Sequence, residues 1–338
     1  MSRILIIRLS ALGDVAMSLP VIYPLVRSNP DKEFYLLSLP FHEKLLIGKP
    51  DNLKFISFFT KEEHKGIGGI FKLFRYLRRY RFTHVADLHS VLRSQILVLL
   101  FKCFSNARIA SIDKERFQKW KLTRKRGKVL SPLKTTFERY SIVFDTLGFR
   151  STETYQPPFP KHKRRDRKML IGIAPFAKYE EKYYPIELME EVVDLLSQDP
   201  MVRIYLFGGG EYERSILDLW AARYPKIQSM VGKLTLSDEL AFISEMDVML
   251  TMDSANMHLA SLVGTRVISI WGATHPYAGF YGWGQRPDDA IQVDLPCRPC
   301  SVFGNKKCFR GDFACMRTIT PRQIVDRIYA HKKKGSSA

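Results

Sequence analysis

Short apolar runs rich in branched residues alternate along the chain with stretches whose apolar residues recur at helical spacing. This alternation is typical of parallel α/β units, in which a helix crosses from one strand to the next. The expected strands are residues 3–8, 34–39, 53–58, 83–88, 107–111, 169–174, 202–207, 247–252 and 266–271. The expected helices are residues 16–28, 68–80, 90–103, 135–147, 185–198, 211–224, 237–245, 255–263 and 321–329. In such folds ligands bind where strands end, so the loops after strands are the places to search.

The middle of the chain interrupts this alternation. Three prolines in four positions, within the run 156–160, cannot continue a helix or a central strand. A basic run follows them directly. We expect two Rossmann-like, doubly wound domains in this 338-residue chain, and we divide it into 1–156, a linker at 157–168, 169–320 and a final helical segment at 321–338.

The net charge of +19 is concentrated in three stretches. Residues 61–81 carry a net +5, residues 113–140 a net +7 and residues 161–168 a net +5. Such surfaces attract nucleic acid, anionic lipid or phosphorylated glycan, although solvated loops and helix faces are the plainer interpretation. No apolar run is long enough for a signal peptide or a membrane span, so we expect a cytoplasmic protein.

The loop after the first expected strand contains Arg8, Ser10, Gly13 and Asp14. Gly13 permits close approach of a ligand. Asp14 lies at the start of the next helix, where a carboxylate commonly caps free backbone N–H groups. A carboxylate at the same place can also act as a general base, and the two interpretations remain open.

Three loops of the second half carry further candidates. Lys178 and Lys182 precede Pro185, where lysine charges and helix N–H groups can hold a diphosphate. Three glycines precede Glu211 and Glu213, either of which can accept hydrogen bonds from a ribose. The third loop opens a helix with small polar residues, which suits an anion, and contains Asp253, Ser254, Ala255 and His258.

Four cysteines, Cys297, Cys300, Cys308 and Cys315, form the pattern C-x2-C-x7-C-x6-C. This set can hold a structural zinc, form disulfides or remain as reduced thiols, and only the first gap has the usual zinc spacing. Cys103 lies in an apolar helical stretch and is expected in the core.

The ordered motifs together resemble glycosyltransferase family 9, the ADP-heptose:lipopolysaccharide heptosyltransferases. The resemblance covers nearly the whole chain and rests on Arg8, Gly13-Asp14 and Pro20, residues 87–94, Glu138-Arg139-Tyr140, Lys182 with Pro185, and Asp253-Ser254 with His258. It implies an α/β fold of the GT-B type, with two Rossmann-like domains facing a central cleft. The N-terminal domain would bind the acceptor, the C-terminal domain the nucleotide sugar, and the last helix would return to the N-terminal domain.

The resemblance also implies an inverting transfer of heptose from ADP-heptose to the inner core of lipopolysaccharide, without metal or cofactor. Asp14 would be the general base and Lys182 would stabilise the leaving diphosphate. Donor contacts would come from Lys178, Glu211 or Glu213, Asp253, Ser254, Ala255 and His258. Acceptor contacts would come from Arg8, Ser10, Gly13, Arg93, Arg124 and Arg126. The partners would be the nucleotide sugar, a lipid-linked anionic glycan and the cytoplasmic face of the inner membrane, with a monomeric enzyme and no nucleic acid.

Two departures from the family pattern leave the donor sugar open. Tyr184 stands where the family has Trp, and Ala255 stands where a glycine is frequent. The alternatives are a related glycosyltransferase with another nucleotide sugar or glycan acceptor, a nucleotide-sugar epimerase and, more remotely, a basic nucleic-acid-binding protein. The last would present aromatic residues on a basic platform.

Overall fold

The structure is a computed structural model that describes residues 2–59, 63–160 and 168–330. By their contacts the residues form two compact units, Met1–Arg116 with Lys134–Pro158 and Phe117–Leu133 with Phe159–Ala338. Most of the basic run after Pro160 and the tail after Ala330 lie outside the described residues. No helix in the described part of the chain is both long and apolar enough to cross a bilayer.

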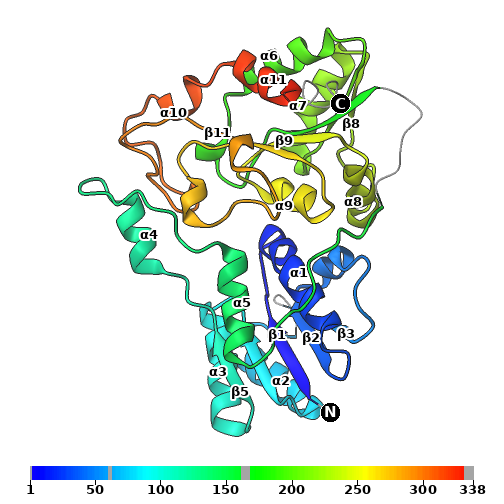
Figure 1. The fold of residues 1–338 in the computed structure, drawn as a ribbon, viewed down its shortest axis with the longest axis vertical. Helices are drawn as coiled ribbons and strands as arrows, with labels where there is room; N and C mark the ends of the chain where they lie inside the picture. Colours follow the sequence, from blue (N-terminus) through cyan, green and yellow to red (C-terminus); the bar gives the residue numbers. More distant parts are fainter. Residues whose placement is uncertain (1, 60–62, 161–167, 331–338) are drawn as a thin grey trace. The chain divides into compact units, whose positions relative to one another are not determined.

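The first unit is built on a five-stranded parallel sheet in the order β3-β2-β1-β4-β5 (Figure 1). Its helices and 3-10 turns connect the strands along the chain. The strands are β1 (Arg3–Ile7), β2 (Glu33–Ser38), β3 (Leu53–Ser57), β4 (His84–Asp87) and β5 (Arg108–Ser111). The helical segments are α1 (Leu12–Arg27), η1 (Pro40–Leu45), α2 (Gly66–Leu77), η2 (Arg78–Tyr80), α3 (Leu92–Phe104) and α5 (Thr136–Thr146).

The second unit holds a six-stranded parallel sheet in the order β11-β10-β9-β6-β7-β8. The strands are β6 (Met169–Ala174), β7 (Val202–Leu206), β8 (Ile227–Ser229), β9 (Val248–Met252), β10 (Val267–Ile270) and β11 (Ala290–Ile291). The helices are α6 (Ile186–Ser197), α7 (Gly210–Arg223), α8 (Leu236–Ser244), α9 (Ala255–Leu262), α10 (Ala314–Arg317) and α11 (Pro321–Tyr329). The 3-10 turns are η3 (Glu180–Lys182), η4 (Pro276–Ala278) and η5 (Pro287–Asp289).

Both sheets have the Rossmann strand order. When the strands are numbered within each unit, the first sheet has the order 3-2-1-4-5 and the second has the order 3-2-1-4-5-6. The order reverses between β1 and β4 in the first unit and between β6 and β9 in the second. These switch points are the places where ligands bind in open α/β sheets. The α/β class and the two Rossmann-like sheets expected from the sequence are confirmed.

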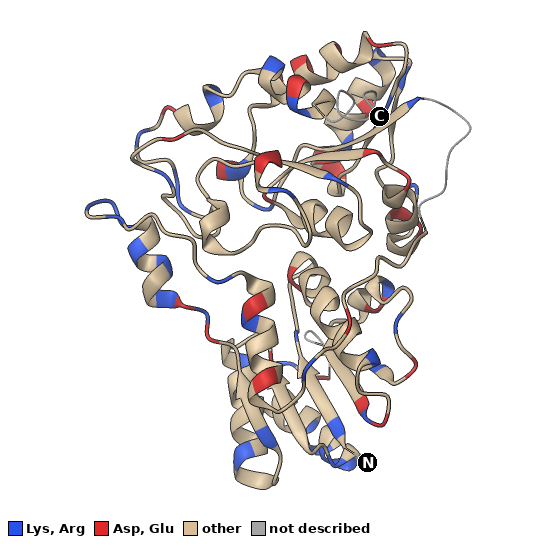
Figure 2. Cartoon of the chain, in the orientation of Figure 1, with Lys and Arg blue, Asp and Glu red and all other residues tan. Residues whose placement is uncertain are grey.

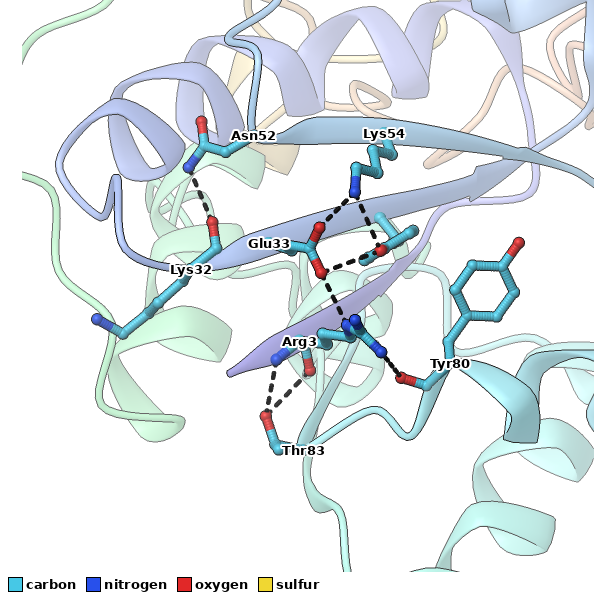
Figure 3. Close-up of polar contacts among 8 residues, drawn as sticks. Arg3, Lys32, Glu33, Asn52, Lys54, Tyr80 and Thr83 are labelled. Atoms are coloured by element: carbon cyan, nitrogen blue, oxygen red, sulfur yellow. Dashed lines mark hydrogen bonds and ion pairs between the residues drawn. The ribbon is translucent and has the colours of Figure 1, made fainter. Parts of the chain in front are cut away.

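A polar network joins the amino ends of the strands of the first sheet, at the end opposite the switch point (Figure 3). The Glu33 carboxylate forms ion pairs with Arg3, whose Nε lies 2.7 Å from Oε2, and with the ammonium of Lys54. These two cations, Lys54 first, lower the pKa of Glu33 to about 2. Arg3 also donates to the carbonyl of Tyr80 at 3.0 Å, which ties β1 to the segment before β4. This network stabilises the amino ends of the strands, and the candidate site is sought at their carboxyl ends.

Two parts of the chain lie elsewhere than we expected. Residues 117–133, which we placed in the N-terminal domain, belong to the second unit. They contain most of α4 (Arg116–Thr123), and the Leu133 amide donates to the carbonyl of Tyr277 at 2.9 Å. The second difference is α11, which we expected to return to the N-terminal domain.

Helix α11 instead packs on α6 of its own unit (Figure 1). Its apolar side chains Ile324, Val325 and Ile328 are buried in the core of the second unit. A capping box between Thr320 and Gln323 starts the helix. The apolar face of α11 therefore packs within the second unit.

Candidate functional site

The first unit presents a charged cluster at its switch point, where β1 and β4 end. Arg8 is buried, and its Nη2 lies 2.7 Å from Oδ2 of Asp14. Its Nη1 donates to the carbonyl of Leu88 at 2.7 Å, and the guanidinium lies over the ring of Tyr140. Arg8 therefore joins the loops after β1 and β4 and holds Asp14 at this edge.

Asp14 is part of the first turn of α1 but is not its N-cap residue. The N-cap is Ala11, whose backbone N–H donates to Asp14 Oδ2 at 3.2 Å. The Asp14 side chain keeps a third of its surface exposed. The carboxylate thus both satisfies a helix-start donor and is open to a ligand, so its capping role does not exclude chemistry.

The loop after β4 is fixed by a fully buried carboxylate. Asp87 accepts the backbone N–H groups of His89 and Ser90, each at 2.9 Å, and the hydroxyl of Ser94 at 3.0 Å. This holds His89 in a buried position, where burial lowers its pKa to about 3, with help from the charges of Arg8 and Lys114. His89 is therefore neutral at physiological pH.

His89 and Lys114 are two members of this cluster that our sequence reasoning did not single out. Burial lowers the pKa of Lys114, and the charges of Arg8 and Arg116 lower it further. The Nδ1 atom of His89 has no hydrogen-bond partner among the residues described. The other expected acceptor residues of this unit are Ser10, half-buried, Gly13, buried in α1, and Arg93, exposed on α3.

The second unit brings two of the expected donor residues together at its own switch point. Lys182 Nζ, from the loop after β6, lies 2.9 Å from Oδ2 of Asp253, which follows β9. Both side chains are largely buried, at 13% and 7% exposure. An ion pair at low exposure holds a lysine in one place, whereas an exposed pair does so weakly.

A glycine that we did not single out makes room for this lysine. Gly304 has φ +75, and a Cβ built on it would meet Lys182 Cγ at 2.3 Å. The aliphatic part of Lys182 therefore lies directly on the Gly304 backbone. The glycine stands in a loop with no strand near it in sequence, and so its role was not visible from the sequence.

Helix α9 begins beside this ion pair. Its N-cap Ser254 makes no side-chain hydrogen bond to the first turn, and its hydroxyl lies 3.0 Å from that of Thr251. Ala255 is the first helical residue and His258, which is 9% exposed, lies one turn in. A helix start without a side-chain cap offers N–H groups and a positive dipole end to an anion.

The remaining donor candidates differ in their exposure and in their contacts. Glu213 is half-buried, and its Oε2 accepts the Gly209 N–H at 2.7 Å, whereas Glu211 is exposed. Burial raises the pKa of Glu213. Lys178 is exposed, with its ammonium 5.5 Å from the ring of Tyr179. Tyr184 is in the core and donates its hydroxyl to the Ile319 carbonyl at 2.6 Å.

The cysteines are all free thiols, which removes the disulfide alternative. Cys315 is buried, and burial raises its pKa to about 11. No group of three or more His, Cys, Asp or Glu side chains in the described ranges is arranged to hold a metal ion. Cys103, expected in the core, is exposed because it lies on the outer face of α3.

Two parallel sheets of Rossmann order make this an α/β protein of the GT-B fold class, the fold of the solved E. coli heptosyltransferases. Residues 70–307 match the model of glycosyltransferase family 9 (heptosyltransferase), and the chain belongs to this family. The expected family and fold class are thereby confirmed.

Similar proteins agree with this assignment. Lipooligosaccharide heptosyltransferase 2 of Campylobacter jejuni is 24% identical over 166 residues, a match that spans 48% of this chain and about half (51%) of that relative. The structure of a glycosyl transferase family 9 protein from Veillonella parvula has a TM-score of 0.75, with 17% identity and coverage of 97% and 96% of the two chains. E. coli heptosyltransferase WaaC with ADP-2-deoxy-2-fluoro heptose has a TM-score of 0.69, with 16% identity and coverage of 97% and 99%.

Proposed function

We propose that this chain is an inverting, metal-independent glycosyltransferase that moves heptose from ADP-heptose to the inner core of lipopolysaccharide. The observation that carries the proposal is the Lys182–Asp253 pair beside the uncapped start of α9, at the switch point of the second unit. This is a cation next to a row of N–H groups, the arrangement that binds a diphosphate. The sugar and the acceptor are those of the family 9 heptosyltransferases to which the chain is similar.

The leaving group is a nucleoside diphosphate, and its departure leaves negative charge on a phosphate oxygen. Fixed cations and oriented N–H dipoles stabilise such charge without reorganising during the reaction. Lys182 and the first N–H groups of α9 serve this role, with Asp253 holding Lys182 and with Ser254, Ala255 and His258 at the phosphates. Glu213, on the loop after β7, is the better candidate for the ribose hydroxyls than the exposed Glu211.

Asp14 is the general base in this scheme. It takes the proton of the acceptor hydroxyl while that oxygen forms a bond to the anomeric carbon and the bond to the diphosphate breaks. Attack on the face opposite the leaving group inverts the anomeric centre. Arg8, which contacts Asp14 at 2.7 Å, orients the base.

The acceptor would be a lipid-linked anionic glycan at the cytoplasmic face of the inner membrane. Lys and Arg residues recur along α2 and α4, and Figure 2 marks those of α4 on the ribbon. Cationic surfaces of this kind attract anionic glycans and lipids. Arg93, exposed on α3, is available for such contacts.

The test is a transfer assay with the full chain. ADP-heptose, a UDP-sugar and a GDP-sugar are each offered with an inner-core glycan acceptor, with and without EDTA, and nucleotide release and the product's anomeric configuration are measured. We expect transfer from ADP-heptose alone, with inversion and with no effect of EDTA. Preference for another nucleotide, retention, or a requirement for a divalent metal would contradict the corresponding part of the proposal.

A further inference from the structure

The second unit contains a pocket of about 390 Å³ that none of the donor residues described above lines. One wall comes from α4 and the turn after it, and the other from the loop that contains the first three clustered cysteines. Four of its lining residues are cations, namely Arg124, Lys125, Lys306 and Lys307. No carboxylate of the described residues lines it.

Hydrogen bonds hold the two walls together. The ammonium of Lys128 donates to the carbonyls of Pro296, Cys297 and Pro299 at 3.3, 2.7 and 2.9 Å. The ammonium of Lys119 lies over the ring of Phe280, 4.6 Å from its centre. Residues 117–133 are therefore held against the rest of the second unit, and these contacts keep the two walls of the pocket in place.

The charge of this pocket is not balanced by the chain itself. None of the four cations has an ion-pair partner among residues 2–59, 63–160 and 168–330. The buried Nε of Arg124 has no hydrogen-bond partner in the same part of the chain. Converging cations repel one another and leave donors unsatisfied, and a bound anion removes both costs. Figure 2 shows this concentration of basic residues on α4 and the loop after it.

Aromatic faces lie among these cations. Trp120 and Phe309 line the pocket, and each is about half exposed. The Arg124 guanidinium lies over Trp120, and the Lys125 ammonium lies over Phe309. An exposed aromatic face offers an apolar surface on which the carbon face of a sugar ring can lie. The pocket thus combines an anion site with a stacking surface.

We propose that this pocket binds a phosphorylated sugar, with the phosphate among Arg124, Lys125, Lys306 and Lys307 and the ring on Trp120 or Phe309. The inference deepens the proposed function, on which it rests for the link to a phosphorylated glycan acceptor. Arg124, expected at the acceptor from charge alone, lines the pocket, whereas its exposed neighbour Arg126 does not.

The experiment is calorimetric titration of the full chain with glucose 6-phosphate, inorganic phosphate and glucose, in the presence of saturating ADP. We expect glucose 6-phosphate to bind more tightly than phosphate, and glucose not to bind. Arg124→Gln should weaken glucose 6-phosphate by about tenfold, the loss typical of one charge-assisted hydrogen bond. Arg126→Gln, the same change two positions away, is the matched control and should stay within about twofold.

A second variant keeps the test independent of the folding of Arg124→Gln. Lys306→Gln with Lys307→Gln changes an exposed loop and should weaken glucose 6-phosphate at least as much. Trp120→Leu should remove the advantage of glucose 6-phosphate over phosphate. Equal losses from Arg126→Gln would show diffuse charge and overturn the site, and equal affinity for phosphate and glucose 6-phosphate would overturn the sugar contact.

Three further outcomes separate this proposal from lipid binding, from binding at the donor site and from the proposed function. If anionic phosphatidylglycerol vesicles bind but glucose 6-phosphate does not, the surface contacts lipid and the pocket proposal is overturned. If glucose 6-phosphate binds only without ADP, it occupies the donor site and the proposal is likewise overturned. If the pocket binds as expected while ADP-heptose gives no transfer, only the proposed function fails.

Discussion

Lys182 and Asp253 form an ion pair, with Nζ 2.9 Å from Oδ2, although they come from loops that follow different strands. The contact exists because β6 and β9 are neighbours in the sheet, so that both loops leave the same edge. Each side chain is largely buried. Asp253 thereby determines where the Lys182 charge lies, and predictions about the donor depend on this pair.

Lys182→Ala should weaken ADP binding by about ten- to a hundredfold, the loss expected when a charged hydrogen bond to phosphate is removed. It should lower kcat as well, because the same charge stabilises the departing diphosphate. Calorimetry with ADP and a steady-state transfer assay measure the two effects. Lys233→Ala, which removes an exposed lysine after β8 of the same unit, is the control and should change either value by no more than about twofold. Equal effects of the two variants would remove Lys182 from the diphosphate site.

Gly304→Ala should also weaken ADP, through displacement of Lys182. The added Cβ would lie 2.3 Å from Lys182 Cγ, so the lysine must move. Gly311→Ala is a matched control, because Gly311 has φ +76 against +75 for Gly304 but nothing within 4 Å of its Cβ position. Both changes cost about 1 kcal/mol of stability for the left-handed backbone, measured by urea unfolding. Only Gly304→Ala should lower ADP affinity, and a loss in both variants would indicate a backbone effect.

The alternation of apolar runs was sufficient to predict the fold class, since the runs at 3–8 and 169–174 are the buried strands β1 and β6. The strands β8 and β11 were missed because three and two residues are too few to show a period. Helix α4 was missed because its eight residues are mostly polar and give no apolar stripe.

The site was predictable as a set of loops but not as a set of contacts. Asp253 and Lys182 were both singled out from their local surroundings. Their pairing depends on the strand order of the sheet, which no local pattern contains. The same holds for Gly304, whose close approach to Lys182 is a tertiary contact, and for Arg124, whose pocket needs the loop around Lys306.

Asp14→Asn should abolish turnover while ADP binding remains within about twofold, because the amide oxygen still accepts the Ala11 N–H but cannot take a proton. Rates should fall by at least about a hundredfold, the contribution of a general base. Calorimetry with ADP and the transfer assay, run on the same preparation, measure both. Near-normal turnover with weakened ADP binding would remove Asp14 from the base role.

His89 makes the first unit sensitive to acid. The folded imidazole has a pKa of about 3, because it is buried and lies near Arg8 and Lys114, against 6.5 as its ordinary value. Between these values the unfolded chain binds a proton that the folded chain does not, so stability falls as the pH drops below about 6.5. From about pH 6.5 to pH 5 this group alone removes about 2 kcal/mol from the free energy of unfolding.

His89→Gln should therefore lose less stability than the unchanged chain when the pH is lowered from about 7.5 to 5, by about 2 kcal/mol. Urea unfolding at both pH values measures this, with the loss between them as the readout. His275→Gln, in the second unit, is a useful comparison because burial, aided by the Arg298 charge, lowers the pKa of His275 to about 4. Probes specific to each unit should assign the His89 effect to the first unit and the His275 effect to the second. An unchanged acid loss in His89→Gln would mean that this imidazole accepts a proton in the folded chain, and that the charges of Arg8 and Lys114 do not control it.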